Sequence, residues 1–261
     1  MLISGKLGTG RPSIKHVIWI FCIALFVRSI YVYIFVESSY FLSEDQTLYI
    51  QLAYQFQSSD FLGVTPQRVP GYPLFLSTIF SVAGKGLWNV VFIQILLDSI
   101  SCVVIALLAK SIFGRGFWIA GVLSAINLNM VVLSATLLTD TLFLFLFVLF
   151  LFSLFQYLKT KSIKWFFFLV LFITLATLVR AVSYYLLPIL LIAILSWRFW
   201  QKDSGLKIIK LTVLYLSVVG ILLGGIHQRN YQQYGSTAFV SQTGAAVLGW
   251  IVPAVYQYSG Q

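Results

Sequence analysis

Charged residues are scarce in this sequence. Only 9% of the 261 residues are Asp, Glu, Lys or Arg, whereas about 25% is typical of a soluble globular domain. Hydrophobic residues make up 60%, and the mean hydropathy is +0.95. So few polar side chains cannot cover so large an apolar core, which excludes a soluble fold, and disorder is excluded because it requires few apolar residues. The apolar runs are continuous rather than alternating, so we expect an all-α polytopic transmembrane bundle rather than a barrel.

Cysteine and histidine are also scarce. Cys22 and Cys102 both fall within apolar runs, with neither the pattern of a disulfide framework nor metal-ligand spacing, so we interpret them as small buried hydrophobes. His16 and His227 lie at opposite membrane faces with no partner at a useful spacing. Neither histidine therefore predicts a metal ligand or a catalytic base.

Seven apolar runs approach the ~20 residues that a helix needs to cross a bilayer. They cover residues 17–36, 86–109, 117–134, 141–158, 165–179, 183–197 and 208–226. The first run differs from a signal peptide because Arg28 interrupts it and no A-x-A cleavage site follows. We therefore predict one integral membrane domain, 1–261, with a large first outer loop at 37–85 and an outer C-terminal tail at 227–261.

The charges are unevenly distributed along the chain. With the N-terminus in the cytoplasm, 12 of the 17 basic residues fall at cytoplasmic ends, as the positive-inside rule requires. Most of the acidic residues fall on the outer side: Glu37, Glu44, Asp45, Asp60 and Asp140. The net charge of +10 therefore reports membrane topology and not nucleic-acid binding. We expect a multi-pass protein of the cell membrane (plasma or inner membrane) whose active face is extracytoplasmic, because the elaborate loop lies there.

The first outer loop contains a segment, residues 43–57, that is typical of a short amphipathic helix resting in the membrane interface. Its apolar positions recur every four residues at Leu48, Leu52 and Phe56. Glu44 and Asp45 fall in its first turn. A carboxylate there either complements the helix dipole or acts as a general base or metal ligand at the water–membrane boundary, and both roles can hold at once.

The same loop closes with Arg68-Val69-Pro70-Gly71-Tyr72-Pro73. Two prolines fix their φ angles and bracket a glycine, which predicts a stiff turn that points Arg68 and Tyr72 in defined directions. We expect the following helix to begin at Pro73.

Several polar residues lie in or beside the predicted spans. Gln94 and Asp98 share one helix face, which favours hydrogen bonds between helices. Asp140 follows Thr139 at the outer start of a span, where it either caps the helix or serves the outer site. Burying an arginine in a span is costly, so a retained one usually has a partner. Arg68, Arg180 and Arg229, which the topology places at the outer boundary, either serve the outer site or snorkel to the interface or pair with Asp140 or Glu37.

Taken together, these pieces resemble the GT-C superfamily of polytopic glycosyltransferases, in particular the bacterial branch related to lipid A aminoarabinose transferases and protein O-mannosyltransferases. The resemblance covers nearly the whole chain, and its most specific part is the Arg-x-Pro-Gly-Tyr-Pro motif. The matching pieces, in chain order, are Asp45-x-x-x-Tyr49-x-x-x-Ala53, Arg68-x-Pro70-Gly71-Tyr72-Pro73, Gln94-x-x-x-Asp98, Thr139-Asp140, Leu178-Val179-Arg180, and Arg229-Asn230-Tyr231 with Gly235 and Ser241 to Gly244.

The resemblance implies transfer of a sugar from a polyprenyl-phosphate carrier to an acceptor hydroxyl on a glycan, lipid or protein. It maps the catalytic carboxylate onto Asp45, with Glu44 as the alternative because close relatives often carry Asp-Glu there. It implies donor-phosphate binding by Arg68, Arg180 and Arg229. The residues that it implies shape the site are Tyr49, Pro70, Gly71, Tyr72, Pro73 and Asp140. A divalent cation that bridges Asp45 and the phosphate is the alternative arrangement, and no other cofactor is expected.

Two other function classes remain open from the sequence. Members of this superfamily usually have more spans, so the chain is expected to be a short or truncated form, which leaves a non-catalytic membrane module that binds carrier lipid or a partner. A transporter or flippase is disfavoured because only Arg28 and Asp98 are ionisable at mid-span and no internal repeat is evident.

Overall fold

The computed structural model describes residues 12–37, 43–58 and 68–240, and these residues form helices and connecting turns without a β-strand. In chain order the α-helices are α1 (Ile14–Phe35), α2 (Glu44–Gln57), α3 (Gly71–Ala83), α4 (Leu87–Phe113), α5 (Phe117–Ala125), α6 (Leu128–Ser134), α7 (Asp140–Thr160), α8 (Ile163–Val179), α9 (Leu186–Trp200) and α10 (Gly205–Tyr234). A 3-10 helix, Ala181–Tyr185, joins α8 to α9. The predicted all-α membrane bundle is confirmed.

Each of the seven predicted apolar runs is helical, but one of them is not a single helix. The run at 117–134 is broken into α5 and α6, which bend by 53° at the break. Within the described part of the chain, five helices are long and apolar enough to cross a membrane, or six if the α5–α6 pair forms one broken span. Helix α8 has 17 residues and is shorter than a typical span.

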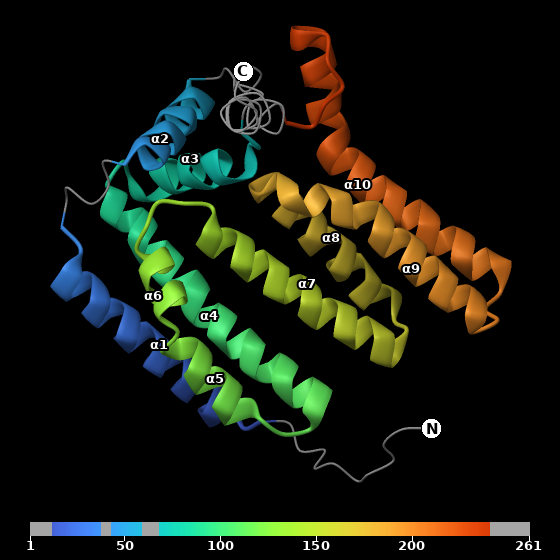
Figure 1. The fold of residues 1–261 in the computed structure, drawn as a ribbon, viewed down its shortest axis with the longest axis horizontal. Helices are drawn as coiled ribbons and strands as arrows, with labels where there is room; N and C mark the ends of the chain where they lie inside the picture. Colours follow the sequence, from blue (N-terminus) through green and yellow to red (C-terminus); the bar gives the residue numbers. More distant parts are fainter. Residues whose placement is uncertain (1–11, 38–42, 59–67, 241–261) are drawn as a thin grey trace, which may run out of the picture.

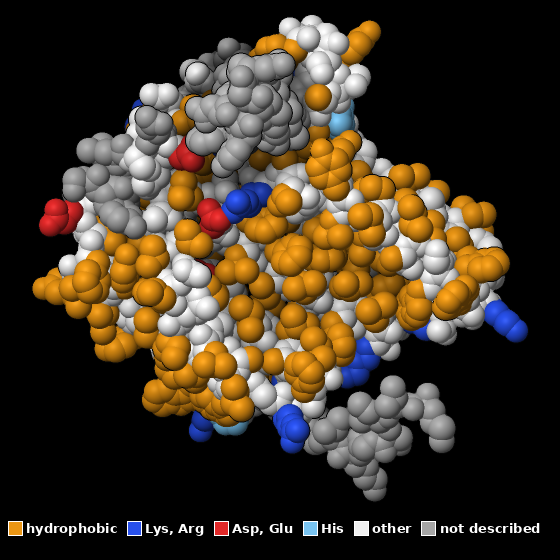
Figure 2. Space-filling model, viewed as in Figure 1, with side chains coloured by type: hydrophobic (Ala, Val, Ile, Leu, Met, Phe, Trp, Pro, Cys, Tyr) orange, Lys and Arg blue, Asp and Glu red, His pale blue; other side chains and the backbone are white. Residues whose placement is uncertain are grey.

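Helix α4 lies at the centre of the bundle, between α1 and α5 on one side and α7 on the other (Figure 1). In its most apolar stretch 61% of the residues are buried, against 17% for α1 and for α10 at the edges. Helix α7 packs on both α4 and α8, and α8 in turn packs on α10. The edge helices expose broad hydrophobic faces (Figure 2), as expected for helices in contact with lipid.

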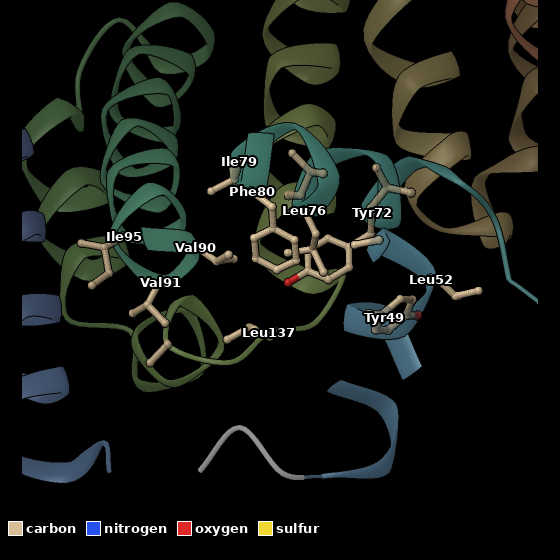
Figure 3. Close-up of a cluster of buried hydrophobic side chains, with 14 of the residues drawn as sticks. Tyr49, Leu52, Tyr72, Leu76, Ile79, Phe80, Val90, Val91, Ile95 and Leu137 are labelled. Carbon is tan, nitrogen blue, oxygen red and sulfur yellow. The ribbon is translucent and has the colours of Figure 1, made fainter. Parts of the chain in front are cut away.

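A second layer, α2 and α3, lies across one end of the long helices (Figure 1). The two short helices pack on each other, and α3 also packs on α4 and α8. Figure 3 shows Tyr72, Leu76 and Phe80 of α3 directed at Val90 of α4 and at Leu137 in the α6–α7 connection. Helices α2 and α3 are therefore attached to the bundle by a hydrophobic cluster that they share with the ends of the long helices.

An ion pair lies in the middle of the bundle. The Arg28 side chain of α1 is fully buried, and its Nε lies 2.5 Å from Oδ2 of Asp98 on α4. The same guanidinium donates to the carbonyl oxygens of Ala24 and Ala125 and to Sγ of Cys102. Because Ala125 ends α5, Arg28 connects α1, α4 and the broken span.

The Arg28–Asp98 pair leads to a stability prediction. Replacing Arg28 with Ala leaves a buried carboxylate without its cation, so we expect a loss of about 3–5 kcal/mol of stability, measured as unfolding of the detergent-purified protein. The matched control replaces both charges, Arg28→Met with Asp98→Leu, and should retain most of the stability. An unchanged stability of the Arg28→Ala protein would contradict the structural role of the pair.

Candidate active site

Asp45 lies in the first turn of α2, in the second layer of the structure. Gln46, next to it, is buried and fixes the helix in two ways: its Nε2 donates to Oγ of Ser43 at 2.8 Å, and its Oε1 accepts from the backbone N–H of Leu137 at 2.9 Å. The second bond ties the start of α2 to the loop that precedes α7. Asp45 is therefore held close to the first residue of α7, which is Asp140.

The Pro-Gly-Tyr-Pro turn forms the start of α3. The helix begins at Gly71, with Pro70 as its N-cap, and not at Pro73 as the sequence suggested. Pro73 fits in the first turn because its missing N–H would have no partner within the helix. Tyr72 is buried, and its hydroxyl donates to Oε1 of Gln94 at 2.7 Å. Gln94 continues the chain of bonds to the backbone at the end of α6, so this residue makes hydrogen bonds between elements, as predicted.

Gly71 marks a close approach between two segments. A Cβ atom at this position would lie 2.5 Å from the carbonyl oxygen of Leu178, which is backbone near the end of α8. Only glycine fits without moving one of the two helices. Since Arg68 precedes Gly71 by three residues and Arg180 follows Leu178 by two, the contact brings both arginines to the same end of the bundle.

Two ion pairs stand at this end. Nη2 of Arg68 donates to Oδ1 of Asp45 at 2.6 Å, and Nη1 of Arg180 donates to Oδ1 of Asp140. The Arg68 guanidinium also lies 5.6 Å from the ring centroid of Tyr49, within the range of a cation–π contact. None of the four charged side chains is fully buried, and Asp45 is 59% exposed.

Both ion pairs line one cavity of about 300 Å³. Its lining comes from α2, the α3 turn, the start of α7 and the end of α8, and comprises Asp45, Tyr49, Arg68, Val69, Leu138, Thr139, Asp140, Val179, Arg180, Ala181, Val182 and Val240. Burial raises the pKa of the Tyr49 hydroxyl, although the nearby Arg68 charge opposes the shift. The phenol therefore stays protonated at neutral pH, and a hydroxyl that can donate a hydrogen bond remains beside the two arginines.

The cavity combines the two chemical functions that the sequence suggested. An exposed carboxylate can accept a proton from a hydroxyl group, and guanidinium groups can stabilise a phosphate. Its two charged pairs carry two negative and two positive charges, so an anionic ligand would have to compete with a carboxylate for each arginine. Among the described residues no group of three His, Cys, Asp or Glu side chains could hold a metal ion. The described lining offers two carboxylates, each paired with an arginine. A divalent cation that bridges Asp45 and the phosphate stays a prediction, and we assign no step to a metal.

The candidate residues fall into three groups. Asp45, Tyr49, Arg68, Asp140 and Arg180 line the cavity together. The second group forms the start of α3 and packs it against the bundle without lining the cavity; it comprises Pro70, Gly71, Tyr72 and Pro73. The side chain of Glu44 lies outside the described residues, as does the motif segment from Ser241 to Gly244.

Arg229 is not brought to the described lining of this cavity. It is buried near the end of α10, where its Nε and Nη2 both donate to Oδ1 of Asn230, at 3.1 and 2.8 Å. Asn230 in turn donates to the carbonyl oxygens of Ala238 and Phe239. In this structure the two residues therefore fasten the segment that follows α10, and a phosphate-binding role for Arg229 stays a prediction.

Three supporting contacts were not anticipated from the sequence. The spacing of Gln94 and Asp98 indicated partners on other helices, but not that Asp98 pairs with Arg28 while Gln94 binds Tyr72. The hydrogen bond between Gln46 and Leu137 could not be predicted from a sequence motif, because the partner is a backbone N–H far away in the sequence.

Comparison with known proteins shows the family and the fold to which the chain is similar. The family model described as dolichyl-phosphate-mannose-protein mannosyltransferase matches residues 66–222. The search of curated proteins finds no match. Among solved structures, the fold resembles the S. cerevisiae protein O-mannosyltransferase Pmt1-Pmt2 complex bound to the sugar donor, with a TM-score of 0.60 and 13% sequence identity. The likeness covers 88% of this chain and 35% of that chain, so this chain spans about a third of its length.

The close approach at Gly71 leads to a second prediction. In a Gly71→Ala protein the methyl group meets the Leu178 carbonyl, so we expect about 1–3 kcal/mol of destabilisation, measured by unfolding in detergent. Gly220→Ala on α10 is the matched control, because nothing lies within 4 Å of the place that its new methyl group would take, and it should be neutral or slightly stabilising. Equal stability of the two variants would show that α3 and α8 are not in such close contact.

Proposed function

Because the chain belongs to the dolichyl-phosphate-mannose-protein mannosyltransferase family, we propose that it is a glycosyltransferase that moves a sugar from a polyprenyl-phosphate carrier to an acceptor hydroxyl. The observation that carries the proposal is the cavity lined by both Asp45–Arg68 and Asp140–Arg180. It combines an exposed carboxylate with two cations beside membrane helices, where a lipid-linked donor and a polar acceptor can meet.

The donor end of the reaction needs positive charge. When the bond between the anomeric carbon and the phosphate oxygen breaks, the polyprenyl phosphate leaves with its negative charge. Arg68 and Arg180 are placed to hold that phosphate, each exchanging part of its present carboxylate contact for the ligand. Their positions are set by α3 and by the end of α8, so little reorganisation is needed when the charge develops.

The acceptor end needs a base. Asp45 uses Oδ1 to accept from Arg68, and its 59% exposure leaves the carboxylate open to an acceptor that approaches from the aqueous side. As the acceptor oxygen attacks the anomeric carbon, Asp45 takes its proton. Attack from the face opposite the leaving phosphate inverts the anomeric configuration. Glu44, one residue earlier, is the alternative base.

The names of the matched family and the yeast complex indicate which sugar and which acceptor to test first. The matched family and the yeast complex both carry names that specify mannose transfer to protein. Mannose linked to a polyprenyl phosphate and a protein hydroxyl are therefore the first donor and acceptor to test, with glycan and lipid hydroxyls next.

The proposed orientation puts the cavity on the extracytoplasmic face of the cell membrane, with the N-terminus in the cytoplasm. Figure 2 supports this assignment, because acidic side chains appear only near the α2–α3 end in that view, while basic side chains dominate the opposite end. A basic excess is typical of cytoplasmic ends.

The base assignment gives the third prediction. Asp45→Asn preserves the size of the side chain but removes its basicity, so we expect sugar transfer by the purified protein to fall by about 100-fold or more. Glu44→Gln is the matched control and should retain most of the activity. If Glu44→Gln loses transfer and Asp45→Asn does not, the base is Glu44. If the unaltered protein binds the donor but shows no transfer to any hydroxyl acceptor, the non-catalytic module is the better interpretation.

The phosphate assignment gives the fourth prediction. Arg68→Ala and Arg180→Ala each remove a cation from the cavity, so we expect the KM for the lipid-linked donor to rise about tenfold or more, while the KM for the acceptor changes less. Arg229→Ala provides the comparison, since the structure places this arginine outside the described lining. A larger donor effect for Arg229 than for Arg68 and Arg180 would contradict the assignment.

A further inference from the structure

A second cavity, of about 250 Å³, lies at the opposite end of the bundle from α2 and α3. It is formed where the turn from α7 to α8 meets the turn from α9 to α10, which Figure 1 shows on the same side of the molecule. Its lining residues are Lys161, Ile163, Arg198, Asp203, Lys207, Lys210 and Leu211. This cavity shares no lining residue with the candidate active site.

The charges of this cavity are unbalanced. Three lysines and one arginine face a single carboxylate, Asp203, so the described lining carries a net charge of +3. Lys161 is the C-cap of α7, with a φ of 52° in the left-handed region, and its Nζ donates to Oε1 of Gln201 at 3.2 Å. Four cations around one small cavity repel one another, and the single carboxylate of Asp203 balances only one of them.

Arg198 is the residue that distinguishes this cavity from an ordinary basic surface. Its side chain is only 7% exposed, although it is charged. Nε lies 2.7 Å from Oδ2 of Asp203 without the alignment of a hydrogen bond, and Nη1 has no hydrogen-bond partner among the described residues. A buried guanidinium with an unused donor is costly, and it is well suited to an oxyanion because its donors form a fork.

The surroundings of the cavity indicate where its ligand comes from. Large apolar side chains beside it are exposed on α9 and α10: Phe199, Trp200, Leu206 and Ile209. Trp200 is 84% exposed at the end of a membrane-length helix, a position typical of the aromatic belt at the membrane surface. The cavity therefore lies at the level where phospholipid phosphates are found.

We propose that this cavity binds the phosphate headgroup of an anionic membrane lipid. Arg198 donates to the phosphate oxygens from the buried wall, and Lys207 and Lys210, one turn apart on α10, contribute charge from the open side. The acyl chains of the lipid lie along the exposed apolar faces of α9 and α10. The site is independent of the proposed sugar transfer, because it uses none of the residues assigned to that reaction.

The test uses the full chain in nanodiscs of zwitterionic phosphatidylcholine, with phosphatidylglycerol added in steps and bound lipid counted by native mass spectrometry. The Lys207→Gln, Lys210→Gln protein should bind phosphatidylglycerol about 30-fold more weakly, because two charge-assisted contacts to the phosphate in the cavity are lost. Arg198 is left unchanged because its replacement would leave Asp203 buried without a partner.

The matched control removes the same charge elsewhere. Lys110→Gln, Lys164→Gln alters two lysines that belong to the same predicted cytoplasmic side but do not line the cavity, and it should change binding severalfold at most. An equal loss in both double variants would overturn the proposal, since the attraction would then be that of a general basic surface. Inorganic phosphate should not displace the lipid. Displacement by inorganic phosphate would show that the site takes a soluble anion and would overturn the assignment to lipid.

Discussion

Gly71 lies so close to the backbone of Leu178 that no side chain fits between them, and the arrangement of the candidate active site depends on this contact. It fixes α3 against the end of α8, through two residues that are more than 100 positions apart in the sequence. Arg68 lies just before α3 and Arg180 just after α8, so one steric constraint positions both guanidinium groups. Arg68 pairs with Asp45 at the start of α2, and Arg180 pairs with Asp140 at the start of α7.

The bundle handles charge in three distinct ways. Arg28 and Asp98 form a fully buried pair that connects α1, α4 and the broken span, and their role is structural. The Asp45–Arg68 and Asp140–Arg180 pairs are partly exposed and line one cavity. The second cavity, around Arg198, has more cations than anions. The paired charges of both cavities therefore lie where helices begin or end, whereas the Arg28–Asp98 pair lies within its helices.

Much of the fold could be predicted because its cause is local. Continuous apolar runs indicate helices, and the four-residue spacing of the 43–57 segment indicated α2. The cavity residues Asp45, Arg68, Asp140 and Arg180 could be proposed from motifs, since each stands at a helix boundary that sequence patterns mark well.

The remaining features depend on partners far away in the chain. The break between α5 and α6 lies inside an apolar run at Asn127, which caps α6 by accepting from the N–H of Met130. The hydropathy of the whole run indicates one span, so the bend depends on how the two helices pack. Helix α3 begins at Gly71 rather than Pro73, at the point where the chain meets the backbone of Leu178. Arg28 pairs with Asp98 because α1 packs on α4. Arg229 matches the motif, but its guanidinium donates to Oδ1 of the neighbouring Asn230. A buried arginine near the end of α10 needs a nearby acceptor.

The most direct test of whether this cavity binds the donor is a crystal or cryo-EM structure of the full chain with a lipid-linked sugar bound. We expect the donor phosphate to lie within hydrogen-bonding distance of Arg68 and Arg180, with the anomeric carbon facing Asp45. A phosphate bound outside this cavity, with both arginines still paired to their carboxylates, would contradict it.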